Sequence, residues 1–65
     1  MAPITVADAL RMALRLERLN CEEYRARARE AASPALRAMF AFLAGEEEKH
    51  IAMVKAKMAE HGVVE

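Results

Sequence analysis

The chain has 65 residues, of which 55% are hydrophobic and 31% charged, and its ten basic residues balance its ten acidic ones. A chain this short is a single domain, residues 1–65, and buries only about 60% of the surface that its unfolded form exposes. Because these charges cancel, the chain has no net positive charge to attract nucleic acid or an anionic membrane. No apolar run approaches the ~20 residues that span a bilayer. No signal-peptide pattern is visible, and the single cysteine, Cys21, has no internal disulfide partner. We therefore expect a soluble, cytoplasmic protein without nucleic-acid or membrane partners.

The sequence predicts two long helices with one strong break between them. Ser33 has the character of an N-cap and Pro34 that of a first helical residue, while Thr5 is a suitable N-cap near the start of the chain. We expect helices over residues 5–32 and 34–61, each about 40 Å long at 1.5 Å per residue. The connection is so short that only an antiparallel hairpin fits it. The expected fold class is therefore all-α.

Apolar residues form a stripe along each predicted helix, when residues are placed at the helical period. The main stripes consist of Val6, Leu10, Ala13, Leu14, Cys21, Tyr24, Ala28 and Ala31 in the first helix and of Leu36, Phe40, Leu43, Ile51, Val54 and Met58 in the second. Further apolar residues lie beside these stripes, namely Met12, Leu16, Leu19, Met39, Phe42 and Met53. Two helices packed only on each other cover one stripe apiece. We therefore expect a homodimer or higher homo-oligomer in which two hairpins form a four-helix bundle.

Two carboxylates interrupt the apolar stripes. Glu17 and Glu47 each lie in the middle of a stripe, and His50 follows Glu47 by one helical turn. A carboxylate in such a place is costly unless it is paired, protonated or bound to a metal. Counted from the turn of the hairpin, all three residues lie at one height, roughly 23 Å away. The sequence therefore predicts one shared, buried site.

Duplication of the hairpin supplies a complete set of metal ligands. Two copies contribute four glutamates and two histidines, arranged as one Glu from each of two helices and a Glu-x-x-His from each of the others. This is the ligand set of di-iron and di-manganese carboxylate bundles. Four carboxylates also balance the charge of two divalent ions, so metal binding neutralises a cluster that would otherwise repel itself. The spacing thus indicates a metal site between two subunits.

Simpler explanations of these residues stay open at this point. A Glu-x-x-His pair alone occurs by chance, usually as a solvated helical pair. Glu17 could pair with a neighbouring arginine, and Glu46 could replace Glu47, because Glu46 and His50 are four residues apart. Metal binding is favoured only because all three residues lie on the apolar faces of their helices and at the same distance from the turn.

Three further residues have candidate roles close to the site. Tyr24 lies two turns from Glu17 on the same stripe, where it could simply pack, hydrogen-bond a ligand carboxylate or trap an oxidising equivalent. Cys21 is one turn from Glu17 and is expected to pack as a small apolar residue. His61 precedes Gly62 and is expected to favour the helix C-terminus through its charge. Neither Cys21 nor His61 is expected to bind metal.

The order of these residues resembles the ferritin-like and rubrerythrin-like superfamily, especially encapsulated ferritins, whose subunit is half of a four-helix bundle. The resemblance lies in "LERLNCEEY", with Glu17 and Tyr24 seven residues apart, and in "SPALRAMFAFLAGEEEKHIAM", and it extends over about residues 10–58. It implies that Glu17, Glu47 and His50 are iron ligands and that Tyr24 supports them. It also implies a site between two subunits, and a further partner that is an encapsulating shell or an iron-storage protein, inside a protein nanocompartment.

The leading hypothesis is a ferroxidase-type di-iron protein, in which the Glu47 carboxylates bridge two ions and Glu17 and His50 cap each one. Dioxygen or peroxide would oxidise Fe(II) at this shared site, for iron storage or detoxification. One alternative is a non-catalytic protein in which zinc or manganese clamps the dimer through the same ligands. Another is a metal-free helical oligomerisation module, in which Glu17 and Glu47 pair with arginines of a partner chain.

Overall fold

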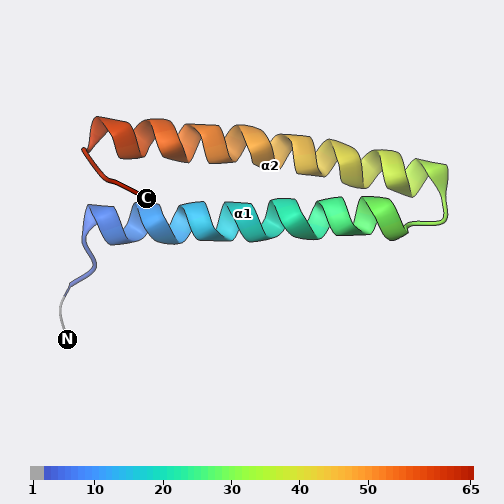
Figure 1. Cartoon of the computed structure of the whole chain (residues 1–65), viewed down its shortest axis with the longest axis horizontal. Helices are drawn as coiled ribbons and strands as arrows, with labels where there is room; N and C mark the ends of the chain where they lie inside the picture. Colours follow the sequence, from blue (N-terminus) through green and yellow to red (C-terminus); the bar gives the residue numbers. More distant parts are fainter. Residues whose placement is uncertain (1–2) are drawn as a thin grey trace.

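The computed structural model describes residues 3–65, which form an antiparallel pair of helices (Figure 1). Helix α1 spans Val6–Glu30 and helix α2 spans Pro34–Glu60, and the described part of the chain contains no strand. The predicted all-α hairpin is confirmed. Its dimensions are 46 × 26 × 13 Å, so that it is only about one helix thick in its shortest direction.

The ends of both helices are capped by side chains. At the start of α1, the Thr5 hydroxyl accepts a hydrogen bond from the Asp8 amide at 3.0 Å, and the Asp8 carboxylate accepts one from the Thr5 amide at 3.1 Å. At the start of α2, the Ser33 hydroxyl accepts from the Leu36 amide at 3.4 Å. Each cap contributes about 1 kcal/mol. Both N-caps are therefore at the residues expected from the sequence.

Helix α1 ends two residues before the predicted boundary. Ala31 is extended, with φ −63° and ψ 131°, and the Arg37 guanidinium donates to its carbonyl at 3.1 Å. Ser33 is extended as well, because the ring of Pro34 disfavours the helical conformation in the residue before it. The chain therefore needs all of residues 31–33 to reverse direction.

The core between the two helices is small. Among the described residues, only Leu14 and Cys21 of α1 and Ala44 and Met58 of α2 are buried. The predicted stripes include three of the four but not Ala44. Most other stripe residues are half-buried, and two are exposed, each in the first turn of its helix. These two are Val6, at 57% exposure, and Leu36, at 52%.

A large part of the apolar surface stays open in the single hairpin. The six apolar residues predicted beside the stripes are all between 48% and 67% exposed. The accessible surface of the chain is 4890 Å², about 800 Å² more than the roughly 4,100 Å² expected for a compact monomer of 7.2 kDa. One side of a standard protein interface covers about the same area. Within residues 3–65, neither helix has an apolar stretch long enough to cross a membrane.

Candidate metal centre

The hairpin brings Glu17 of α1 together with Glu47 and His50 of α2. One possible ligand atom from each side chain lies within 4.8 Å of the other two. The Nδ1 atom of His50 is 3.2 Å from Oε2 of Glu17 and 3.6 Å from Oε2 of Glu47. The residues predicted to lie at one height along the hairpin are therefore neighbours in the structure.

Close approach of the two helices places these side chains side by side. Cys21 follows Glu17 by one turn and Ala44 precedes Glu47 by one turn, and both small residues are buried. The Sγ atom of Cys21 lies 3.7 Å from the carbonyl oxygen of Ala44. Because residues one turn apart share a helix face, this contact directs both carboxylates toward the same edge of the interface.

The three side chains differ in their exposure. The Glu47 side chain is 13% exposed, that of Glu17 26%, and that of His50 47%. The cluster thus begins between the helices at Glu47 and opens to the surface at His50. His50 is therefore the member of the cluster most open to a further molecule.

Glu47 is the most electrostatically strained residue of the cluster. Its Oε2 atom is buried and has no hydrogen-bond partner in the described structure. The pKa of Glu47 is raised, first by a hydrogen bond with Glu17 that favours the protonated form, then by burial and by repulsion from Glu17, while His50 opposes the shift. His50 is therefore the one neighbour named here that favours ionised Glu47, and it is outweighed by Glu17 and by burial.

No lysine or arginine side chain of the described residues relieves the two carboxylates. Among residues 3–65, neither Glu17 nor Glu47 is within 4.0 Å of a lysine or arginine nitrogen. The arginine next to Glu17, Arg18, forms its ion pair with Glu65 instead. Glu46, the alternative to Glu47, pairs with Lys49 at 3.0 Å and is outside the cluster. Among residues 3–65, His50 is therefore the one basic side chain within 4.0 Å of these two carboxylates.

The donor set suits a divalent first-row metal. Carboxylate oxygen and imidazole nitrogen bind iron, manganese and zinc. A cation would satisfy the unpartnered Oε2 of Glu47 and cancel its repulsion from Glu17. Three side chains from one hairpin leave such an ion with open coordination positions on the exposed side.

The supporting residues have structural roles in the single hairpin. Tyr24 is half-buried and stacks on Phe40, with ring centroids 6.4 Å apart and an angle of 27° between the planes. It does not belong to the group of possible metal ligands. Cys21 packs in the core, and His61 is the C-cap of α2.

Two features of the structure were not expected from the sequence. Ala44 contacts Cys21 at the centre of the interface, but alanine is so frequent on α2 that nothing in the pattern distinguishes it. The return of residues 63–65 across the hairpin was not expected either. Gly62, with φ +64°, is the signal for that reversal.

Comparison of the chain with protein-family models, curated proteins and solved structures gives no match. The cluster of Glu17, Glu47 and His50 is therefore the feature of this chain that points to a function.

Proposed function

We propose that this chain is a ferroxidase-type di-iron protein whose site is completed by a second copy of the hairpin. The observation that supports this proposal most directly is the convergence of Glu17, Glu47 and His50 within 4.8 Å, around a buried carboxylate oxygen without a partner. An ordinary solvated helical pair does not place an acceptor in that position.

The need for a second copy follows from the exposure of the cluster. His50 remains 47% exposed, and Leu36, which shares a stripe with Glu47, is 52% exposed. A second hairpin over this face would cover both residues and use the surplus of about 800 Å² of surface. It would also bring the ligand count to four glutamates and two histidines, which balance the charge of two divalent ions.

Iron bound here is the substrate, and it supplies the electrons of the reaction. Two Fe(II) ions give up one electron each, and these two electrons with two protons convert dioxygen to hydrogen peroxide, or hydrogen peroxide to two molecules of water. The part of the protein is to hold two such ions close together in a site from which most water is excluded. Glu47, the most enclosed ligand, is best placed to be shared between the ions. The carboxylates stabilise Fe(III) more than Fe(II), because Fe(III) carries one more positive charge.

An anaerobic iron titration followed by exposure to oxygen tests the proposal. We expect two Fe(II) bound per dimer, measured by metal analysis and by the mass of the complex in solution, and rapid oxidation on mixing with dioxygen. His50→Ala should abolish rapid oxidation, while Glu46→Gln, adjacent to the site but paired with Lys49, should retain it. Binding of one ion per hairpin in a stable monomer would contradict the shared site.

The same titration with other metals distinguishes the alternatives. If zinc or manganese raises the melting temperature but iron is not oxidised, the site is a structural clamp. If no divalent metal changes the melting temperature, the hairpin is a metal-free oligomerisation module. Either result would overturn the proposed ferroxidase activity.

A further inference from the structure

The side of α2 that faces away from α1 carries exposed apolar side chains. Six residues follow one another along this side in alternating steps of three and four, and together they are named the α2 edge: Met39, Phe42, Glu46, Lys49, Met53 and Ala56. This spacing keeps them on one line of the helix, as in the contact line between two packed helices. Ala44 and Met58, on the opposite side of α2, are buried in the core. Met39, Phe42 and Met53 are instead more than half exposed, so the single hairpin leaves the α2 edge uncovered.

The order of residues along the α2 edge is symmetric. Phe42 precedes Glu46 by four residues, and Met53 follows Lys49 by four. When a second copy of α2 runs antiparallel to the first about the midpoint between Glu46 and Lys49, every position meets its mirror position. Phe42 then faces the partner's Met53, and Glu46 faces the partner's Lys49. Each of these contacts occurs twice, because the two copies are equivalent.

Both kinds of contact are favourable in that arrangement. A thioether packs well against an aromatic ring, and the contact of Phe42 with the partner's Met53 removes two exposed side chains from water. Glu46 and Lys49 already form an ion pair at 3.0 Å within one helix. In the antiparallel pair each carboxylate also meets an ammonium group of the other copy. No charge of the α2 edge then lies opposite a charge of its own sign, so the edge is complementary to itself.

A hollow beside the α2 edge gives a second helix room to approach. It has a volume of about 600 Å³ and is lined by Phe42, Gly45, Glu46, Glu48, Lys49 and Ala52. A Cβ atom added at Gly45 would meet nothing within 4 Å in the described structure. Glycine destabilises the interior of a helix relative to alanine, and packing against α1 does not require it at this position. The absence of a side chain there suits a partner helix that comes close to this side of α2.

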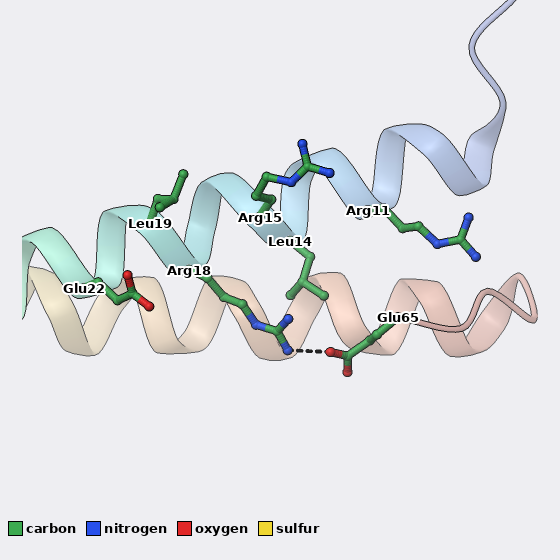
Figure 2. Close-up of a pocket in the computed structure, with 7 residues that line it drawn as sticks. All are labelled: Arg11, Leu14, Arg15, Arg18, Leu19, Glu22 and Glu65. Atoms are coloured by element: carbon green, nitrogen blue, oxygen red, sulfur yellow. Dashed lines mark hydrogen bonds and ion pairs between the residues drawn. The ribbon is translucent and has the colours of Figure 1, made fainter.

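The outer edge of α1 lacks this symmetry. Figure 2 shows Leu19 and Arg15 pointing away from α2, beside a groove of about 350 Å³. This arginine groove is lined by Arg11, Leu14, Arg15, Arg18, Leu19, Glu22 and Glu65. Along the outer edge of α1, the apolar residues end at Leu19 and are followed by Glu23 and Glu30. Two antiparallel copies of that edge would place apolar side chains against carboxylates, which is unfavourable.

We propose that the α2 edge is a second interface between copies of this chain, in which two hairpins pair through antiparallel α2 helices. It is separate from the metal-site face, because Glu17, Glu47 and His50 neither belong to the α2 edge nor line the hollow beside it. Hairpins that share a metal site are joined to further hairpins through this edge. Hairpins without metal pair through the edge alone.

Exchange of the two charges between copies tests this interface. Glu46→Lys and Lys49→Glu each place like charges opposite one another, so either variant alone should have at most half the parental mass in solution. In an equimolar mixture, the lysines of one variant face the glutamates of the other, and the parental mass should return. Mixing does not restore the ion pair within each helix, so only contact between copies accounts for that recovery. Lys57→Glu is the matched control, because it breaks a similar pair with Glu60 at 3.0 Å, lies past Ala56, and should keep the parental mass.

Sedimentation of the metal-free protein supplies the readout for these variants and for an apolar one. Phe42→Ala should raise the dissociation constant of the edge contact roughly 100-fold, because a side chain that is 60% exposed is lost from both copies. Leu19→Ala, which removes a similarly exposed side chain from α1, should leave that constant unchanged. Equal masses for the parent and Lys49→Glu, or a mixture that stays at the mass of the single variants, would overturn the inference. Failure of the metal site would not, because the parent and its variants are compared without metal.

Discussion

Leu36 provides the most direct test that a second hairpin covers the metal-site face. Its position in the stripe of Glu47 predicts a core residue, yet the single hairpin leaves it 52% exposed. Leu36→Ala removes three carbon groups at about 0.8 kcal/mol each when buried. With half of the side chain still to be covered by a partner, the loss is about 1.2 kcal/mol per copy, or about 2.5 kcal/mol per dimer. We therefore expect the dissociation constant of the dimer to rise roughly 70-fold.

Sedimentation over a range of protein concentrations measures this change. Leu19→Ala is the matched control, because Leu19 is 54% exposed but lines the arginine groove instead of the metal-site face. Both substitutions remove a similar amount of apolar contact within the hairpin, so only the dimer equilibrium should distinguish them. Equal dissociation constants for the two variants would refute this arrangement. A compact, folded monomer of the parent protein at micromolar concentration with metal present would refute the dimer itself.

Two other predictions concern the charge of the metal centre. Glu47→Ala should abolish rapid iron oxidation but raise the melting temperature of the metal-free protein, since it removes a largely buried carboxylate that repels Glu17. Oxidation at the parental rate would disprove its role. Because the pKa of Glu47 is raised in the folded state, the metal-free protein should gain stability from this group as pH falls through that raised pKa toward the ordinary glutamate value. The stabilisation due to metal should instead fade over the same pH range, since protons displace the ion from His50 and the carboxylates. Thermal melts should therefore show that, as pH falls, the stability contributed by Glu47 rises without metal and the stability contributed by metal decreases.

The hairpin and the cluster were predictable because both depend on helix geometry. The N-caps at Thr5 and Ser33 and the break at Pro34 are local signals, and they mark where each helix begins. Equal distances from the turn then place Glu17 opposite Glu47 without any knowledge of side-chain packing. Such arithmetic works here because the short connection makes the two helices run antiparallel from a common turn.

The sides on which the helices touch were less predictable. A stripe wide enough to face two neighbours does not show which of its edges meets the first one. The small residues Cys21 and Ala44 decide this, because they let the backbones come close. The position of Glu65 could not be predicted from the sequence either. Its contact with Arg18 joins residues 47 apart and depends on a reversal of the chain at Gly62.

The exposure of His50 links metal binding to assembly. If each ion takes ligands from two hairpins, metal must strengthen the dimer, and dimerisation must strengthen metal binding by the same factor. Leu36 is outside the cluster and more than three turns from His50 along α2. The Leu36→Ala variant should nevertheless bind Mn(II) more weakly than the parent when it is diluted below its dimer dissociation constant. It should bind Mn(II) with the parental affinity when it is concentrated well above that constant. A site held within one hairpin would give a single affinity at both concentrations, so a titration repeated at two protein concentrations decides whether the second copy contributes ligands or merely covers apolar surface.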